Sequence, residues 1–245
     1  MCGRFNVSST PGLQALMDSL GLSIDLPPPR FNIAPTESVG LLARFSDVVE
    51  VRSARWWLTP AWSKGPDTKY AMFNARCEGL KKSPAFRKPF ASQRGIVPMS
   101  SFIEWRAGEG GKQPWLITNE ASALSVAALW DFWRPPGSNN QESLLSCTLV
   151  TTAAANPFEP WHKRMPVMLT PDEAASWLAP GTIESDSALF DPRLKENLYL
   201  YPVDRAVGNS RIKDSNGMDP VGDTVLLKAE DVSSPAERQG ERQVE

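Results

Sequence analysis

Histidine and cysteine are scarce in this chain. Its 245 residues include a single histidine, His162, and three cysteines, Cys2, Cys77 and Cys147, which lie far apart in the sequence. A mechanism that needs two imidazoles is therefore excluded, and the absence of a Cys-x-x-Cys pair argues against a structural zinc site. We expect neither a metal nor another cofactor. A few cysteines without a pairing pattern are typical of a reducing compartment.

Long apolar runs are also missing. No stretch approaches the roughly 18 apolar residues that a membrane-spanning helix needs. The start, MCGRFNVSST, has no basic segment followed by an apolar one, so it does not resemble a signal peptide. We therefore expect a soluble protein with no membrane partner, located in the cytoplasm or associated with the nucleoid.

The chain has almost no net charge. Its 26 Lys+Arg and 28 Asp+Glu give −2, which at first argues against a nucleic-acid partner. The charge is unevenly divided, because residues 1–115 carry 15 basic and 9 acidic side chains, a net of +6, and the remainder carries 11 and 19, a net of −8. The average therefore leaves room for a basic face that suits single-stranded DNA.

Short apolar runs separated by turn residues make up most of the chain. We expect extended segments or strands over residues 1–7, 39–45, 48–58, 94–105, 113–120, 123–133 and 144–154, and another strand after the loop that contains His162. A proline-rich connector is expected over residues 26–37.

Three short helices are expected, each with a hydroxyl residue before a proline. They begin at Pro11, Pro84 and Pro171, and Gly21 is the expected end of the first one. Strands and helices do not alternate as βαβ units, so the pattern predicts an α+β, mainly-β fold. We assign one domain to residues 2–228 and a polar, disordered tail to residues 229–245.

Cys2 is the first candidate for chemistry. If Met1 is removed, Cys2 carries a free α-amine next to its thiol. Such an aminothiol condenses with an aldehyde, because the amine forms an imine and the thiol then closes a five-membered thiazolidine ring. The alternative is that Cys2 is a small buried residue near the start of the chain, since free cysteine is among the most buried residue types.

Three further segments could support such chemistry. Glu104 shares a strand face with Phe102, where burial would make it a proton shuttle; the alternative is a solvent-facing glutamate on an edge strand. His162, among aromatic and basic neighbours, could act as a base or hydrogen-bond donor, or could be an ordinary loop histidine. In the run FNAR, Asn74 offers an amide for a carbonyl or hydroxyl group, and Arg76 offers a guanidinium for phosphate.

Basic and aromatic side chains are interleaved in the first part of the chain. This combination suits single-stranded nucleic acid, because cations follow the backbone while rings stack on unpaired bases. Trp62 is the best candidate for an exposed stacking or wedge residue. Alternation along the strand sends only one of Trp56 and Trp57 into the core. The alternative is that the tryptophans are core residues and the lysines form an ordinary solvated face.

Seven segments in order resemble one family, the SOS response-associated peptidase (SRAP) family. They are MCGRF, RFNIAPTE, WWLTPAWSK, FNARCEGLKKSPAFRKPF, VPMSSFIEW, VTTAAAN and HKRMPVML, and the resemblance covers roughly residues 2 to 209. It implies a barrel-like sheet core with short peripheral helices. It also implies a sensor of abasic sites in single-stranded DNA that forms a thiazolidine DNA–protein crosslink.

The resemblance also implies a role for each matching residue. Cys2 is the nucleophile, Asn74 holds the opened sugar or the amine, Glu104 shuttles protons, and His162 assists opening of the sugar ring. Residues implied or expected to contact DNA are Arg4, Trp62, Arg76, Arg87 and Arg164. The cysteine and the glutamate are also expected to remove the initiator methionine autocatalytically.

Two departures from the family pattern stand out. Trp57 replaces a glycine, so the backbone there does not rely on a positive φ, and Ile103 replaces a tyrosine. Two other functions stay open on the residues alone. One is a peptidase or N-terminal-nucleophile hydrolase that uses Cys2 on peptides in trans, and the other is a module that binds single-stranded or modified DNA non-covalently.

Overall fold

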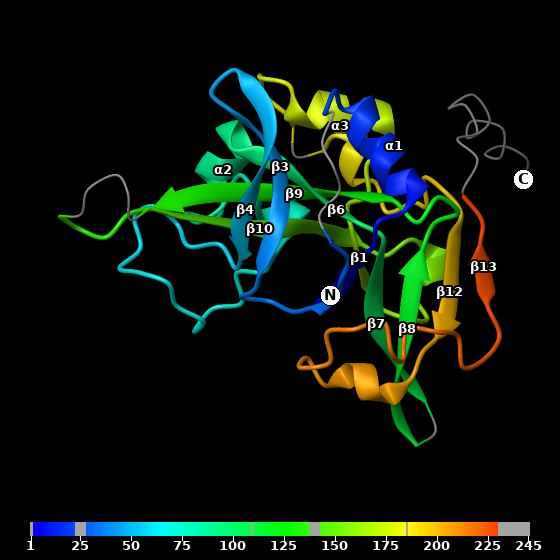
Figure 1. Ribbon diagram of the computed structural model, residues 1–245. Coiled ribbons are helices and arrows are strands. Elements are labelled where there is room, and N and C mark those ends of the chain that lie inside the picture. Colours follow the sequence, from blue (N-terminus) through cyan, green and yellow to red (C-terminus); the bar gives the residue numbers. More distant parts are fainter. Residues whose placement is uncertain (1, 23–27, 109, 138–142, 185, 230–245) are drawn as a thin grey trace, which may run out of the picture.

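The computed structural model describes residues 2–22, 28–108, 110–137, 143–184 and 186–229, and most of the expected C-terminal tail lies outside these ranges. Two β-sheets make up most of the described chain (Figure 1). The first sheet has the strand order β13 (Val225–Leu227), β12 (Leu198–Pro202), β8 (Gly111–Thr118), β7 (Ser101–Gly108), β1 (Phe5–Val7) and β2 (Arg30–Ile33). All of its neighbouring strands are antiparallel.

The second sheet closes on itself. Its strand order is β11 (Arg164–Pro166), β10 (Leu144–Ala153), β4 (Val48–Trp56), β3 (Ser38–Phe45), β6 (Arg94–Met99) and β9 (Leu124–Trp133), with β5 (Asn74–Arg76) also paired to β10. Because β9 pairs with both β6 and β10, five of these strands form a ring. The prediction of a mainly-β fold with a barrel-like core is therefore confirmed.

Two of the three expected helices form as the sequence predicts. Helix α1 (Pro11–Ser19) begins with Thr10, whose side chain accepts a hydrogen bond from the Leu13 N–H. Gly21, at φ +76°, ends it in the left-handed conformation that glycine adopts without strain. Helix α3 (Pro171–Leu178) begins with a capping box, in which Thr170 and Glu173 each bind the backbone of the other. None of the described helices is long and apolar enough to cross a membrane.

The third helix begins later than expected. Residues 84–86 form a turn, and α2 spans Arg87–Ser92. The Ser83 side chain does not cap it; instead the Ser83 carbonyl accepts the Phe86 and Arg87 N–H groups. Pro89 is tolerated at the third helical position because an N–H there has no partner within the helix. Four short 3₁₀ helices complete the described elements: Cys77–Gly79, Asn156–Phe158, Ala188–Phe190 and Arg205–Gly208.

Two strand predictions need correction. The run 94–105 is divided at Ser100 into β6 and β7, which belong to different sheets. The expected connector 26–37, of which residues 26 and 27 lie outside the described ranges, contains β2 paired to β1. The short strands β5, β12 and β13 were not predicted, because segments of three to five residues carry too little periodicity.

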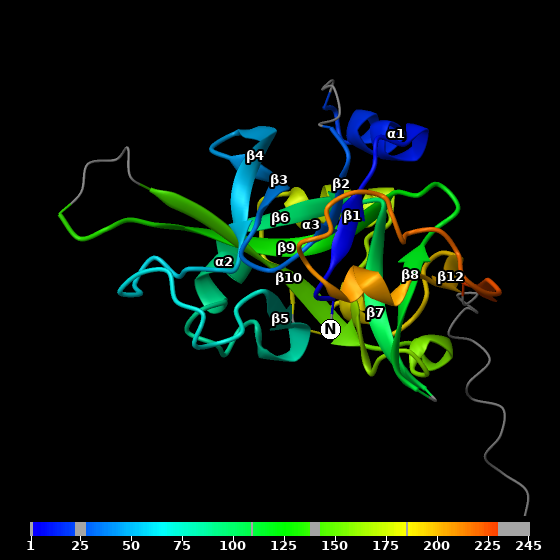
Figure 2. The same cartoon turned by 60° about the horizontal axis from the view of Figure 1, so that its bottom comes forward.

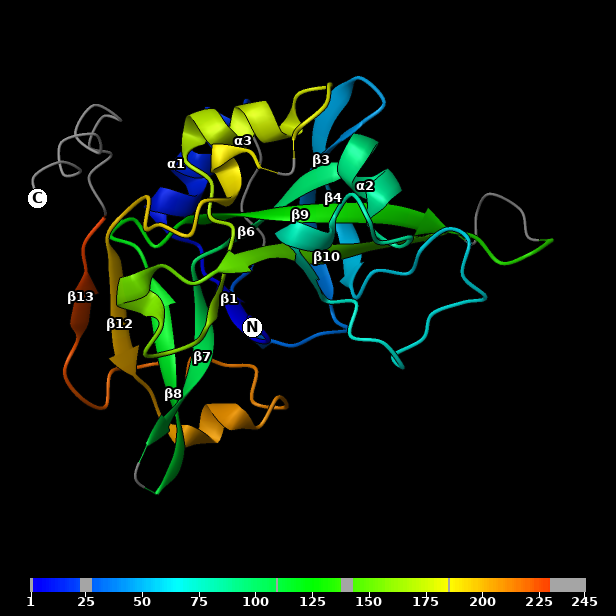
Figure 3. The ribbon, with the colours of Figure 1, turned by 180° about the vertical axis from the view of Figure 1, so that it is seen from behind.

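The core lies on both sides of the ring. One buried cluster lies between the two sheets and inside the ring, and Phe5, Trp56, Phe102 and Cys147 belong to it. A second cluster packs α1, α2 and α3 against the outer side of the ring, where Figure 3 shows α1 and α3 above β6 and β9. The start of the chain lies where the two sheets meet (Figures 1 and 2).

Candidate functional site

Cys2 is built into the interior of the protein. It precedes β1, its side chain is fully buried, and it belongs to the cluster between the two sheets. Its Sγ atom lies 3.8 Å from the carbonyl oxygen of Arg4, and its own carbonyl accepts a hydrogen bond of 2.9 Å from the Asn74 side-chain amide. The expectation that Cys2 is a small buried residue is thus correct. Its buried position lies close to other candidate residues.

Asn74 reaches Cys2 from β5. This strand of three residues pairs in parallel with β10, where Asn74 is opposite Leu149. Alternation turns Ala75 toward the helix-covered cluster and leaves Asn74 on the side of Cys2. The Asn74 Oδ1 atom is buried without a hydrogen-bond partner within the described part of the chain. Asn74 therefore holds the start of the chain with its amide and keeps an acceptor for a further group.

Glu104 is buried and does not face solvent. It lies on β7, an interior strand between β8 and β1, and is 3% exposed. Burial raises the pKa of its carboxyl group, while the nearby His162 lowers it. The expected alternation also holds, because Phe102 packs in the cluster with Cys2 whereas Ile103 packs in a separate cluster on the other face. The alternative of a solvent-facing glutamate on an edge strand is wrong.

The Cys2 thiol is protonated in this environment. Burial raises its pKa, and the charge of Glu104 raises it further. A thiolate is the reactive nucleophile, so the thiol must transfer its proton when it reacts. Glu104 is close enough to influence the thiol electrostatically, and His162 influences Glu104 in the same way. Glu104 thus interacts electrostatically with both the Cys2 thiol and His162, and we call these three residues the coupled set.

His162 lies in the half-buried loop between the helix Asn156–Phe158 and β11. The Arg164 backbone N–H donates to its Nδ1 atom at 2.9 Å. A neutral imidazole held in this way carries its proton on Nε2. The carbonyl oxygen of Arg164 lies 3.0 Å from the same Nδ1 atom. The backbone of Arg164 therefore contacts this nitrogen through both of its polar groups.

The four arginines expected to contact DNA differ in their accessibility and in their contacts with other side chains. Arg76 and Arg87 are exposed, at the end of β5 and on α2. Arg4 is half-buried, its guanidinium lies 5.6 Å from the centre of the Trp105 ring, and burial lowers its pKa. The Arg164 side chain is only 16% exposed and forms an ion pair with Glu78. Arg164 is therefore the least available of the four for a phosphate.

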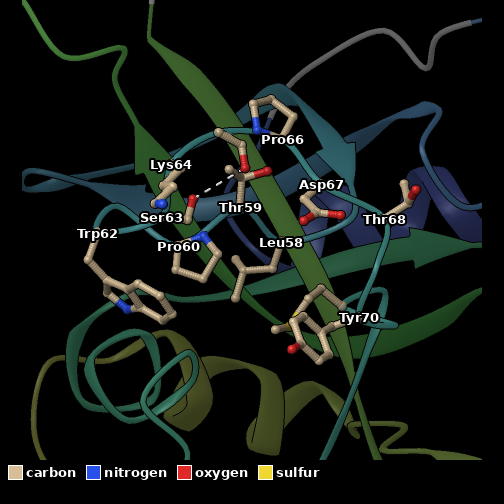
Figure 4. A pocket seen from close by; sticks show the side chains of 12 residues that line it. Leu58, Thr59, Pro60, Trp62, Ser63, Lys64, Pro66, Asp67, Thr68 and Tyr70 are labelled. Carbon is tan, nitrogen blue, oxygen red and sulfur yellow. Dashed lines mark hydrogen bonds between the residues drawn. The ribbon is translucent and has the colours of Figure 1, made fainter.

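Trp62 is exposed, as expected. Its side chain is 67% accessible and stands at the rim of a hollow of about 760 Å³ formed by the loop between β4 and β5. Figure 4 shows Trp62 and Tyr70 on opposite sides of this hollow. The loop returns at Met72, whose carbonyl accepts the Leu58 N–H, two residues before Asn74. The hollow therefore adjoins the segment that carries Asn74.

Trp56 and Trp57 are both buried, so the prediction that only one of them points inward is wrong. Strand β4 ends at Trp56, and alternation no longer applies to the residue after it. Trp57 packs against Phe73, with 5.2 Å between the ring centres. Trp57 is not among the described residues with positive φ, as expected for a position that holds a tryptophan.

Sequence reasoning missed Glu78. It lies in the 3₁₀ helix Cys77–Gly79, directly after β5, and binds Arg164 through both carboxylate oxygens. The only feature of the sequence that could have pointed to Glu78 was its position four residues after Asn74. The described residues contain no group of three or more His, Cys, Asp or Glu side chains that could hold a metal ion.

The fold and the site together define a mainly-β protein whose candidate reactive centre is built around the second residue of the chain. The family model described as SOS response associated peptidase (SRAP) matches residues 1–210. The chain therefore belongs to the SRAP family, as its motifs indicate.

The relatives agree with this assignment. The abasic site processing protein YoqW of Bacillus subtilis (strain 168) is 32% identical over 219 residues, which are 86% of this chain and 96% of that protein. The abasic site processing protein HMCES of Xenopus tropicalis is 31% identical over 180 residues, 64% of this chain and 53% of that protein. A crystal structure of a protein from Bacteroides thetaiotaomicron has a TM-score of 0.64 at 21% identity, covering 83% of this chain and 93% of that one. This last likeness shows the fold.

Proposed function

We propose that this protein senses abasic sites in single-stranded DNA and captures them covalently through Cys2. The observation that carries the proposal is the arrangement around buried Cys2: the Asn74 amide donates to its carbonyl, and Glu104, which interacts with His162, is close enough to influence its thiol electrostatically. The names of the relatives, which are abasic site processing proteins, support DNA as the partner.

The proposed reaction starts once Met1 is removed and Cys2 carries the free α-amine. His162 assists opening of the deoxyribose ring, which exposes an aldehyde. The amine adds to the aldehyde carbon, and loss of one water gives an imine. The thiol sulfur then adds to the imine carbon while its proton passes to the nitrogen, which closes the thiazolidine. Glu104 is suited to move these protons, because a buried carboxyl with a raised pKa can both accept and return one.

The DNA strand is proposed to lie across the basic part of the chain. Arg4, Arg76 and Arg87 would contact phosphates, and Trp62 would stack on an unpaired base at the rim of its hollow. None of these steps needs a metal or another cofactor, and we expect a monomer to carry them out, in the cytoplasm and on the nucleoid.

Removal of Met1 is proposed to be autocatalytic, with Cys2 as the nucleophile and Glu104 as the proton-transferring group. Intact mass spectrometry of purified protein tests this step. The wild type should lack Met1, whereas Cys2→Ala and Glu104→Gln should retain it. Loss of Met1 from the Glu104→Gln protein would assign the removal to a cellular aminopeptidase.

Crosslinking is tested with an oligonucleotide that contains one abasic site. After incubation at neutral pH, the wild type should give a slower band that survives heat and SDS, and the mass of the adduct should be that of protein plus DNA minus one water. Cys2→Ala should give no band, whereas the matched variants Cys77→Ala and Cys147→Ala should keep it, because neither of these cysteines carries an α-amine beside its thiol.

The same assay separates the other two functions. A band that disappears at high salt indicates non-covalent binding, since counterion release dominates such affinities. Cleavage of added peptides without any DNA adduct indicates a peptidase that acts in trans. Either result would refute covalent capture.

A further inference from the structure

Glu78 lies outside the coupled set of Cys2, Glu104 and His162, and its environment sets it apart from other surface carboxylates. Its two oxygens accept hydrogen bonds of 2.6 and 3.0 Å from the two terminal nitrogens of Arg164. This is the bidentate arrangement that fixes a guanidinium in one orientation. The hydrogen bond from Arg164 lowers the pKa of Glu78, so the carboxylate stays charged at neutral pH.

Arg164 is held from a second side as well. One of its terminal nitrogens donates to the Thr151 carbonyl at 2.7 Å, and its backbone is part of β11, where Arg164 is opposite Ala153 of β10. The backbone N–H of the same residue donates to His162 Nδ1. Arg164 therefore binds Glu78 through its guanidinium and the imidazole through its backbone.

These contacts also join two parts of the site that are far apart in sequence. Glu78 follows Asn74 directly through β5 and the 3₁₀ helix, whereas His162 belongs to the loop before β11. Because Glu78 is 56% exposed on its side chain, its ion pair adds little to stability. Its geometry instead links the 3₁₀ helix that follows the Asn74 strand to the first residue of β11, directly after the His162 loop.

We propose that Glu78 is a positioning residue, which orients Arg164 and through it selects the tautomer and orientation of His162. The effect that we expect on the crosslinking rate rests on the proposed function. The effect that we expect on the imidazole of His162 does not. Without Glu78 the Arg164 guanidinium loses its bidentate partner and keeps only its contacts with Thr151, so the end of β11 that carries the N–H facing Nδ1 is held by fewer contacts.

The single histidine gives a direct measurement. Protein labelled with ¹⁵N-histidine shows the signals of one imidazole, and the chemical shifts of its two nitrogens report the tautomer. We expect mainly the Nε2–H form in the wild type and a mixture of tautomers in Glu78→Ala. Glu50→Ala is the matched control, because it removes the carboxylate of another exposed ion pair, with Arg52, and should leave the imidazole signals unchanged.

Crosslinking kinetics provide the second measurement. At saturating abasic DNA, Glu78→Ala should form the adduct roughly 10-fold more slowly, a part of the 10²–10⁴-fold that a positioned acid–base group contributes. Its affinity for the same strand without an abasic site should be equal or higher, since one negative charge is gone. Glu78→Asp, which keeps the charge, should recover part of the rate.

The two measurements test the inference and the proposed function independently. Identical imidazole signals in the wild type and Glu78→Ala overturn the inference, whether or not either protein crosslinks DNA. A mixed tautomer with an unchanged rate would overturn the link between His162 and catalysis. A changed tautomer in a protein whose wild type forms no adduct would support the positioning by Glu78 and refute the proposed function.

Discussion

Replacing Glu104 with glutamine should make the protein more stable while it abolishes crosslinking. Glutamine has nearly the same size and cannot ionise, so the substitution removes the charge that burial penalises and leaves the packing against β8 and β1 in place. Carboxyls that serve in catalysis are often held in surroundings that cost stability, and their replacement often stabilises the protein.

The size of the effect depends on pH. The pKa of Glu104 is raised by burial, so the folded protein binds this proton more tightly than the unfolded chain does. Below about pH 4.3, the ordinary pKa of glutamate, the carboxyl is protonated in both the folded and the unfolded protein. Its burial then does not lower the free energy of unfolding through ionisation. As the pH rises through the raised pKa, the wild type loses about 1.4 kcal/mol of unfolding free energy for each unit by which the pKa is raised.

Urea unfolding of the mature wild type and Glu104→Gln between pH 4 and pH 8 measures this difference. The two proteins should be similar at pH 4, and the variant should be more stable at pH 8, where each kcal/mol raises Tm by about 2–4 °C for a domain of this size. Intact mass must first show that both proteins have the same N-terminus. A variant that is less stable than the wild type at pH 8 would refute the reasoning, because the carboxylate would then be stabilised by its partners more than burial penalises it.

Three other substitutions or reagents test the description of the surface, a helix and the core. Trp62→Ala should weaken binding of single-stranded DNA by about 1–3 kcal/mol. Tm should not change, because the residue is 67% exposed. Fluorescence anisotropy measures the affinity, most of which Trp62→Phe should retain. Thr170→Ala should lower the free energy of unfolding by about 1 kcal/mol, since it removes half of the capping box of α3; an unchanged urea midpoint would contradict the cap. Cys147, whose pKa burial raises to about 12, should react with a thiol reagent in urea but not in buffer, and rapid labelling of the folded Cys77→Ala protein at Cys147 would show that β10 is open.

Sequence reasoning succeeded where the signal is local. The hydroxyl and proline before α1 and α3, and Gly21 after α1, define helix ends through contacts within a few residues. The long strands on either side of the turn at Ser46 were equally clear, because apolar runs of this length have few alternatives.

The parts that could not be predicted depend on partners far away in the chain. Strand β5 has three residues and exists because β10 lies beside it. Ser100 divides one apolar run between two sheets, which no pattern within the run reveals. Trp57 is buried because Phe73 lies next to it. Glu78 forms its ion pair only because β11 brings Arg164 within reach. The candidate site residues were proposed from motifs, but the contacts that support them required the fold.

Strand β10 has a consequence for how the protein is made. It pairs with β9, β4, β5 and β11, and it is synthesised long after Cys2 and Asn74 have left the ribosome. Pairings across such distances in sequence form slowly. Strand β5, which carries Asn74, pairs with β10, so Asn74 takes its place beside Cys2 only after residues 144–153 have been made.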